Sequence, residues 1–498
     1  MCTSMRSNVL RSGASGLVVS LILAGCAVGP NFVRPAPPAL TRYLPAGQLP
    51  AAMSAEDHPQ HFVAGASVSA QWWELFHSPA LDQTVSDALK ANQSVASAVA
   101  TLHQSEDQLR AGYGVFFPQI SAGLGADRQR ASLATFGQAG QSSIFNLFTL
   151  SGSISYLVDL FGGARRQVES LGADVDFEHN TVLAAYLSLS ANVVNTSIAR
   201  AGYRAQIAAT RSLIAAASSE VDLTKAQTQA GTAPYSAVLA LQTQLSSLEA
   251  SLPPLELRAD QADHLLAVLA GRAPSEWTPP NLALSDFSLP ENLPLSLPSE
   301  LVRQRPDILT AEARLHVASA QIGVTTAALF PTINLSGSLG SSTNEWSALG
   351  KQSNRFWSSD AGLTVPVFQG GAAWYGRKAA MDAFQAAQAD YRQVVLAAFQ
   401  QVADVLRALD HDAELLRAER ASADAAAENL SMTQANYQAG LVDYLTVLSA
   451  TAQFQNAQLG LISAQAQQLQ DTVALYVALG GGWWNTKNPA PTVTVATP

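Results

Sequence analysis

The sequence predicts an α+β membrane protein built from a duplicated unit, with four membrane-length β-strands and long coiled-coil helices in each chain. Three observations lead to this fold class. Three short motifs recur in the same order about 210 residues apart, stretches beside them alternate apolar and polar residues, and two runs of nearly 70 residues contain no proline.

The first 25 residues have the layout of an export signal. Arg6 and Arg11 give a basic start, and about eight largely apolar residues follow, which is far short of a membrane-spanning helix. The next stretch, LAGC, resembles a bacterial lipobox and predicts that Cys26 becomes the acylated first residue of the mature chain. The alternative is an ordinary signal peptide with an incidental cysteine.

Residues 26–70 are expected to form an extended, lipid-anchored tether. Six prolines hinder a core in this stretch: Pro30, Pro35, Pro37, Pro38, Pro45 and Pro50.

The composition limits the partners of the chain. Only 13% of the residues are charged, and removal of residues 1–25 leaves 26 basic and 38 acidic residues, a net charge of −12. This charge argues against nucleic acid and anionic lipid as partners. No uninterrupted apolar run after residue 25 is long enough for a membrane helix.

Three motif pairs indicate a duplication. FPQI returns as FPTI, DLFGGARR returns as VFQGGAAW, and QAGTAPYSAVL returns as QAGLVDYLTVL, with offsets of 208 to 213 residues. A unit of this size is too long for a solenoid repeat. The predicted organisation is a first repeat at 71–271, an inter-repeat equatorial segment at 272–300, a second repeat at 301–482 and a tail at 483–498.

Two alternating stretches in each repeat predict β-strands with one apolar and one polar face. The expected strands cover about 115–126, 148–160, 331–340 and 357–368. Each is about 10 residues long, which suffices to cross a bilayer as a tilted strand. Half-buried strands of a soluble sandwich are the alternative, but helices rather than further strands follow.

The proline-free runs, from Ala164 to about Ala230 and from Ala372 to about Ala439, predict helices of roughly 100 Å. A heptad seam indicates coiled-coil packing in the second: Val395, Phe399, Val402, Leu406, Leu409, Ala413 and Leu416. Returning helices are expected after Gly231 and Gly440. The stretch LPP at 252–254 should split the first of them, and the second should run to about Leu479.

Four strands cannot close a barrel, and open sheet edges are not tolerated in lipid. Copies must therefore share strands: two would supply eight and three would supply twelve. Twelve leave room for a lumen, which the small residues Gly123, Ser153, Ser336 and Gly362 also suit, so a trimer is favoured.

At this point the chain resembles the TolC/OprM-type outer-membrane efflux channels, in particular the NodT-like lipoprotein branch. The motifs that carry the resemblance are YLVDLFGGARRQV at 156–168, the stretch at 303–340 with RPDI, AE, IG and FP, PVFQGG at 366–371 and the YQAG…YLTVL turn at 437–448. The resemblance covers about residues 26–482.

The resemblance implies a homotrimer with a 12-stranded outer-membrane barrel that continues as a helical periplasmic tunnel. It implies passive conduction of substrates, with a periplasmic adaptor (membrane fusion protein) and an inner-membrane pump, of the RND type, as partners. The expected location is the outer membrane, with lipid on Cys26 as anchor. No other cofactor, no metal and no enzymatic activity are expected, since the eight histidines are scattered.

The resemblance also implies the site residues. The tip turns for adaptor docking match Gly231, Thr232, Gly440 and Leu441. The family places an apolar residue and, four positions later, an acid at its periplasmic gate, and these positions match Leu445 and Ser449.

Because Ser449 replaces the acid, a mainly steric gate is expected. Asp443 is an additional candidate for charge at the gate, with helix capping as its alternative role. For Leu445 the alternative is packing within a coiled-coil seam.

Two other function classes compete with a channel. A lipid-anchored coiled-coil scaffold or adaptor without a pore would explain Cys26 and the heptads but not four amphipathic strands. An envelope enzyme would need a cluster of catalytic groups, and the sequence motifs contain none.

Overall fold

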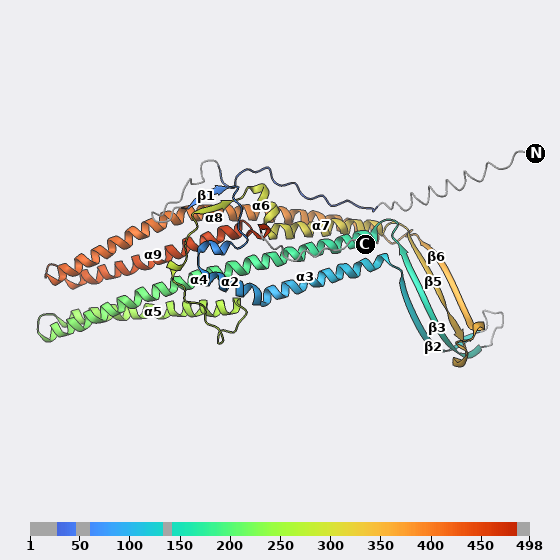
Figure 1. The fold of residues 1–498 in the computed structure, drawn as a ribbon, viewed down its shortest axis with the longest axis horizontal. Helices are drawn as coiled ribbons and strands as arrows, with labels where there is room; N and C mark the ends of the chain where they lie inside the picture. Colours follow the sequence, from blue (N-terminus) through green and yellow to red (C-terminus); the bar gives the residue numbers. More distant parts are fainter. Residues whose placement is uncertain (1–26, 46–59, 133–141, 486–498) are drawn as a thin grey trace, which may run out of the picture. The chain divides into compact units, whose positions relative to one another are not determined.

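The computed structural model describes residues 27–45, 60–132 and 142–485, and the chain divides into two compact units (Figure 1). Unit 1 comprises Met1–Arg34, Leu102–Glu178 and Ala311–Tyr391, and unit 2 comprises Pro35–Thr101, His179–Thr310 and Arg392–Pro498. Neither unit coincides with a sequence repeat, because each repeat contributes residues to both.

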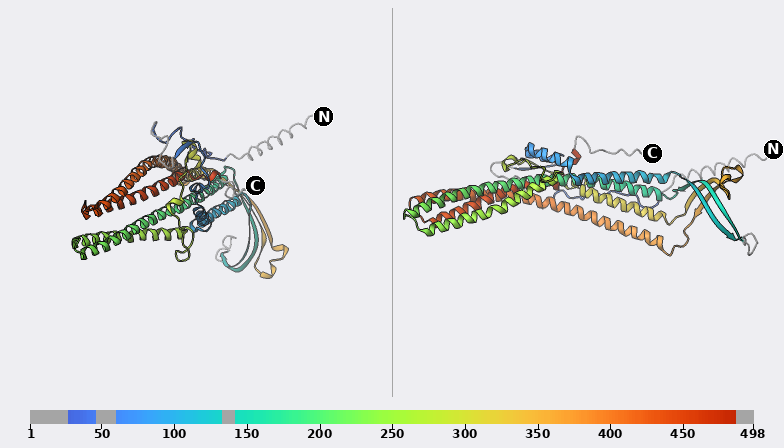
Figure 2. Two further views of the ribbon diagram at one scale, coloured as in Figure 1. Left: turned by 60° about the vertical axis from the view of Figure 1, so that its left-hand side comes forward. Right: turned by 90° about the horizontal axis from the view of Figure 1, so that it is seen from below.

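The long helices repeat residue for residue. Helices α4 (Gly163–Gln229) and α8 (Ala372–Gln438) have 67 residues each, and α5 (Tyr235–Leu269) and α9 (Tyr444–Ala478) have 35 each. Every boundary of the second pair lies 209 positions after its counterpart in the first. In Figures 1 and 2, α5 runs back beside α4, and α9 runs back beside α8.

The predicted break in the first returning helix is wrong. Helix α5 continues through Pro253 and Pro254, although each proline removes a backbone hydrogen bond. Buried residues flank the prolines on both sides, with Leu248 before them and Ala259 after them. Burial of these flanking turns offsets the cost of a proline pair, which is about 3 kcal/mol or more for each residue in isolation.

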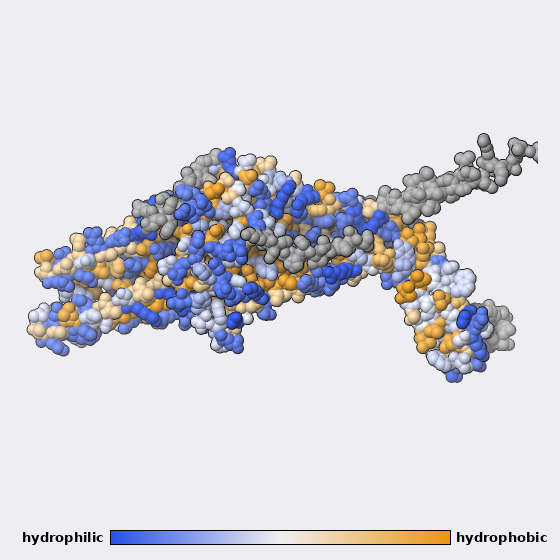
Figure 3. Space-filling view, in the orientation of Figure 1, coloured by the Kyte–Doolittle hydropathy of each residue, from blue (hydrophilic) through white to orange (hydrophobic). Residues whose placement is uncertain are grey.

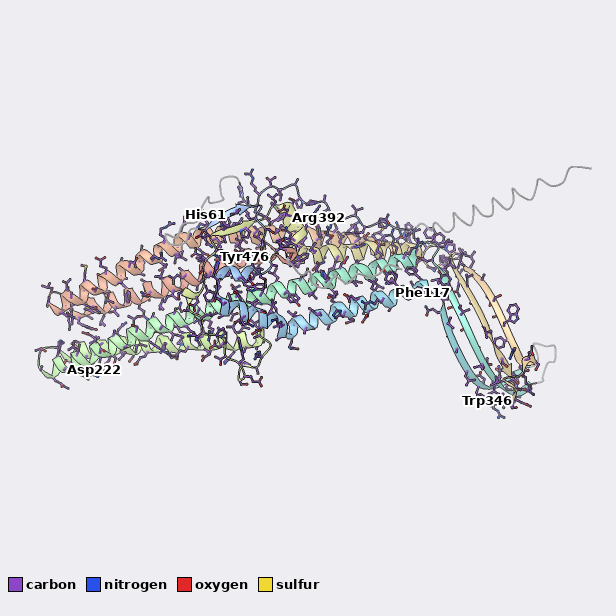
Figure 4. The ribbon with its side chains drawn as sticks, in the orientation of Figure 1. His61, Phe117, Asp222, Trp346, Arg392 and Tyr476 are labelled. Carbon is purple, nitrogen blue, oxygen red and sulfur yellow. The ribbon has the colours of Figure 1, made fainter. Side chains whose placement is uncertain are left out.

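The predicted heptad seam forms the core of α8. Val395, Val402, Leu406, Leu409, Ala413 and Leu416 are all buried, and Phe399 is half-buried. Near the end of α9, the buried ring of Tyr476 (Figure 4) stacks on Trp72 with centroids 5.6 Å apart.

Unit 2 also holds short elements that the sequence analysis did not predict. Strand β1 (His61–Ala64) pairs in parallel with β4 (Asn292–Leu295), so part of the expected tether joins the inter-repeat segment in a small sheet. The other short elements of unit 2 are η1 (Trp72–Phe76), α2 (Pro79–Ala91), η4 (Leu284–Asp286), α6 (Pro298–Gln304) and η7 (Trp483–Asn485).

The spacing of Arg303 and Asp307 would allow an ion pair on one continuous helix, but the helix is interrupted between them. Helix α6 ends at Gln304, and α7 (Pro306–Ala327) begins two residues later. Pro306 disfavours helical geometry at the residue before it, and Arg305 is extended, with φ −76° and ψ 125°. Asp307 therefore pairs with Arg305.

Unit 1 contains a four-stranded antiparallel sheet in the order β2-β3-β5-β6. Helix α3 (Gln93–Gly112) and η2 (Tyr113–Phe116) lead into β2, and α7 leads into β5. The strands are β2 (Gln119–Ser132), β3 (Ser142–Val158), β5 (Thr332–Thr343) and β6 (Arg355–Thr364), with η5 (Trp346–Ala348) and η6 (Gln352–Asn354) between the last two.

The strand boundaries correct those expected from the sequence. Strands β2, β3 and β5 extend several residues further toward the loops, where polar residues interrupt the apolar alternation. Strand β6 begins earlier and ends at Thr364, before Pro366, instead of reaching residue 368. We call the end of the sheet that carries the β2–β3 and β5–β6 loops its outer end, and the opposite end its inner end. In Figure 4, Trp346 lies at the outer end and Phe117 at the inner end.

The two faces of the sheet differ in chemistry. Residues paired across strands share a face, and the rows Ile120–Ile154, Leu124–Leu150 and Leu339–Trp357 lie on one of them. Nine of the eleven exposed large apolar side chains of the strands belong to this apolar face, and Leu157 and Phe356 are the exceptions. Apolar side chains over the sheet appear in orange in Figure 3.

Among the described residues, α4 has a stretch long and apolar enough by composition to cross a membrane, and half of that stretch is buried. This burial is typical of a core helix in a bundle.

Candidate functional site

The two hairpin tips are closed by the same backbone motif. Gly231 and Gly440 have φ of 75° and 72°, in the left-handed region that favours glycine. The amide of Thr232 donates to the carbonyl of Gln227 at 2.9 Å, and that of Leu441 donates to Asn436 at 2.8 Å. These bonds over five residues define Schellman turns, so both predicted tip turns lie where the sequence analysis expected them.

The gate candidates Leu445 and Ser449 lie one turn apart on an exposed face of α9. Leu445 is 65% exposed in the single chain, while Val447 and Ala450 point to the other side and are buried. The internal seam of the hairpin is therefore formed by Val447 and Ala450. The first hairpin has Ser236 at the position equivalent to Leu445, so of the two hairpins only the second has a leucine at this position.

Asp443 is the N-cap of α9. Its carboxylate accepts hydrogen bonds from the backbone N–H of Thr446 at 3.0 Å and from the hydroxyl of the same residue at 2.6 Å. These two bonds, the hydroxyl first, hold the pKa of Asp443 below its usual range. Two roles were considered for Asp443, charge at the gate and helix capping, and this geometry supports helix capping.

An aromatic pair beside the gate candidates was missed by the sequence analysis. The rings of Tyr437 and Tyr444 meet edge-on with centroids 5.2 Å apart. Burial, followed by the charge of Glu220 on α4, raises the pKa of Tyr444. The first hairpin has Thr228 at the position equivalent to Tyr437. This difference between the repeats is the sequence signal that could have identified the aromatic pair.

The polar face of the sheet has small, hydroxylic side chains. Ser121 and Ser153 are hydrogen-bonded across β2 and β3 at 2.7 Å, and Ser338 and Ser358 across β5 and β6 at 2.8 Å. Gly123, Ser153, Ser336 and Gly362, predicted to face the lumen, all lie on this face by strand register.

The predicted lipidation site, Cys26, lies outside the described residues, but the segment directly after it is docked against the helices of unit 1. The guanidinium of Arg166, 4% exposed, donates to the carbonyls of Val28 and Gly29 and to the side chain of Asn31. The amide of Val28 donates to the carbonyl of Phe161 at 2.9 Å. The expected tether is therefore fixed over residues 27–34, a part we call the docked segment.

Aromatic and ionic contacts complete this docking. The ring of Phe32 stacks on His316 with centroids 4.2 Å apart, and His316 lies 3.1 Å from a carboxylate oxygen of Glu169. Arg34 pairs with Glu312 at 2.6 Å. Proline content indicated an extended backbone correctly but carried no information about these partners.

Within the described ranges, no three His, Cys, Asp or Glu side chains form a group suited to a metal ion. His103 and His411 lie beside acids on their own helices, Glu106 and Glu414, and His316 lies beside Glu169 of α4.

The family model for "Outer membrane efflux protein" matches residues 84–272 and 297–481, once in each repeat. Nodulation protein T of Rhizobium leguminosarum bv. viciae is 31% identical over 493 residues, which cover 95% of this chain and 94% of the relative. The pyoverdine export outer membrane protein OpmQ of Pseudomonas aeruginosa is 30% identical, with 93% and 97% covered.

Solved structures agree with this assignment. The outer-membrane channel OprN superposes with a TM-score of 0.82 at 27% identity, covering 92% of this chain and all of OprN. The open state of the Neisseria gonorrhoeae MtrE outer membrane channel gives 0.79 at 25% identity, with 93% and 100% covered. The two family matches, the near-complete coverage and the shared fold show that the chain belongs to the outer membrane efflux protein family.

Proposed function

We propose that three copies of this chain assemble in the outer membrane into one channel of a tripartite efflux system. The sheet order β2-β3-β5-β6 leaves β2 and β6 as edges, and unpaired edges are not stable in lipid. Pairing of β6 with β2 of the next copy removes both edges. Three copies then give twelve strands with the apolar face toward lipid and the serine-rich face toward a lumen.

Transport through this channel is passive, and the energy comes from partners. A periplasmic adaptor binds the tips at Gly231, Thr232, Gly440 and Leu441, and an inner-membrane pump of the RND type delivers the cargo. Relatives with nearly equal identity are named for pyoverdine export and for toluene efflux, which supports selection of cargo by the pump rather than by the channel.

The gate is a ring of three Leu445 side chains at the periplasmic tips. The observation that supports this gate is the exposure of Leu445 on the face of α9 opposite the buried residues of the hairpin. Ser449, one turn further, adds no charge, and Asp443 is engaged as a helix cap, so closure is mainly steric.

Acyl chains on Cys26 anchor each subunit. The docked segment supports this proposal, because it holds the residues directly after Cys26 near Phe161 and Gly162, where β3 gives way to α4. Lipid attached at Cys26 would therefore lie close to the inner end of the sheet.

The test is single-channel conductance of the lipidated protein in planar bilayers. Wild type should be mostly closed, Leu445→Ala should raise the mean conductance several-fold, and Leu441→Ala, at the same tip and 74% exposed, should leave it unchanged. If the pore of the Leu445→Ala variant stays closed, the gate lies elsewhere. Absence of conductance from a confirmed trimer would favour a lipid-anchored scaffold without a pore.

A further inference from the structure

The charged residues of the four strands are segregated by face. The strands contain five of them: Asp127, Arg128, Arg130, Arg355 and Asp360. By strand register the three arginines lie on the apolar face and the two aspartates on the polar face. An arginine on a lipid-facing surface is costly at the membrane centre and becomes tolerable only near an interface.

Side-chain contacts agree with this assignment. Arg130 donates from Nε to the hydroxyl of Ser142 at 2.9 Å, and both residues belong to the apolar-face rows. On the other face, a Cβ added to Gly125 would lie 3.7 Å from a carboxylate oxygen of Asp127. Asp127 therefore points away from Arg128 and Arg130, which follow it in sequence, and it does not neutralise them.

All three arginines lie toward the outer end of the sheet. Arg355 is the first residue of β6 after the outer loop, and Arg128 and Arg130 fall within the last five residues of β2. Each of the three is exposed. Hydrophilic side chains at this end of the sheet appear in blue in Figure 3.

Closure of the proposed barrel brings the arginines of two subunits together. Strand β6 has 10 residues and β2 has 14, so an antiparallel register that pairs all of β6 places Arg355 opposite a residue between 128 and 132 of the neighbouring β2. The apolar faces must also match, which leaves positions 128, 130 and 132. In every one of these registers, Arg355 is a direct or diagonal cross-strand neighbour of Arg130.

Neighbouring guanidinium groups on one face repel each other unless an anion lies between them. The described strand residues provide no carboxylate on this face. Guanidinium groups bind phosphate through paired hydrogen bonds, and they do so best in a partly dehydrated setting. A cluster of two or three at the lipid-facing outer rim of a barrel is therefore suited to a phosphate carried by a lipid.

We propose that Arg128 and Arg130 of one subunit and Arg355 of the next form a site for the phosphate groups of a glycolipid in the outer leaflet. The site rests on the proposed trimer, because one subunit supplies only part of it. The negative net charge argued against anionic lipid as a partner, but net charge ignores distribution, and on this face the strands carry three positive charges and none negative.

The test is native mass spectrometry of the detergent-purified trimer with a bis-phosphorylated lipid A and with its dephosphorylated form. We expect up to three phosphorylated lipids per trimer and at least tenfold weaker binding of the dephosphorylated lipid. The double variant Arg130→Gln/Arg355→Gln should lose binding of the phosphorylated lipid at least tenfold. Lys351→Gln removes a positive charge from the β5–β6 loop, off the sheet, and should bind as wild type does.

Several outcomes would overturn the proposal. Equal binding of the two lipids, or full binding by the double variant, would show that acyl chains alone bring the lipid to the protein. Displacement of the lipid by equimolar inorganic phosphate would make this a general anion site. Detection of monomers alone would refute both the proposed trimer and the proposed site. Detection of a trimer without bound lipid would refute the site alone.

Discussion

Arg305 and Asp307 form a bidentate ion pair across the break between α6 and α7, with Nε–Oδ1 at 3.0 Å and Nη2–Oδ2 at 2.7 Å. The same guanidinium donates to the carbonyl of Ala478 at 2.8 Å and to the side chain of Gln401 at 2.7 Å. One buried side chain thus joins the start of α7, the middle of α8 and the end of α9.

We predict that Arg305→Ala lowers the free energy of unfolding of unit 2 by about 2 kcal/mol, because it leaves the buried carbonyl of Ala478 without its hydrogen-bond donor. The measurement is guanidinium unfolding followed by helical circular dichroism. Arg303→Ala is the matched control, since that side chain is exposed, and its midpoint should not move. Equal shifts in both variants would contradict the role given to Arg305.

The docked segment depends on a close approach of two glycines. Gly29 has a φ of 90°, and a Cβ added to it would lie 2.5 Å from the Cα of Gly323. We predict that Gly29→Ala releases the segment, because left-handed geometry costs a non-glycine residue roughly 1–2 kcal/mol before the steric overlap is added. Hydrogen exchange of the Val28 amide should become tenfold faster or more.

Gly65→Ala provides the control for this prediction. Gly65 also has a positive φ, of 74°, but an added Cβ would meet no atom within 4 Å. Exchange at Val28 should be unchanged in this variant. Protection of Val28 that survives in Gly29→Ala would mean that the bonds to Arg166 hold the segment without the glycine contact.

Periodic patterns predicted the elements whose stability is local. The heptad seam of α8, the alternation of the strands and the glycine turns all depend on spacing along the chain, and each is found in the structure. The NodT-like resemblance and the repeat offsets correctly indicated the family and the duplication.

The errors concern features fixed by distant residues. Pro253 is tolerated within α5 because buried residues further along the helix on both sides, Leu248 and Ala259, hold it in place. The segment from Val28 to Arg34 is ordered by contacts with helices far along the chain. Strand β1 is only four residues long, and its partner β4 contains Pro294, so neither gives a periodic signal. The outward face of Leu445 follows from helix phase, but the proposed gate would need other copies of the chain, and the helix pattern of one chain carries no information about them.

A buried acid on α8 makes the stability of unit 2 dependent on pH. Burial, and after it the neighbouring Asp471, raises the pKa of Asp412 to about 7, from a usual value of 3.8. The folded chain keeps a proton here that the unfolded chain releases, so stability falls as the pH rises from about 4 to 7 and is level above 7.

Asp412→Asn should abolish this dependence, because the amide stays neutral. We expect equal stability of variant and wild type at pH 4, and above pH 7 a gain for the variant on the order of 4 kcal/mol. Chemical unfolding at a series of pH values measures it. Asp404→Asn, an exposed position on α8, should leave the pH dependence of wild type intact.

The cap of α9 offers a way to separate two roles of one carboxylate. Asp443 caps the helix turn that bears Leu445, so Asp443→Ala should loosen that turn and raise channel conductance, by less than Leu445→Ala does. Asp443→Asn keeps an oxygen acceptor and removes the charge, and asparagine caps helices about as well as aspartate. The asparagine variant should therefore conduct as wild type does.

Acidification should reproduce the alanine variant. Because the pKa of Asp443 is lowered in the folded chain, its stabilising effect is present at pH values above the usual 3.8 and is lost as the pH falls through the lower, folded value. Conductance of wild type should rise in that acidic range, while Asp443→Asn should not respond there. If the asparagine variant instead conducts like alanine at neutral pH, the charge of Asp443 acts in the pore, and the gate is electrostatic as well as steric.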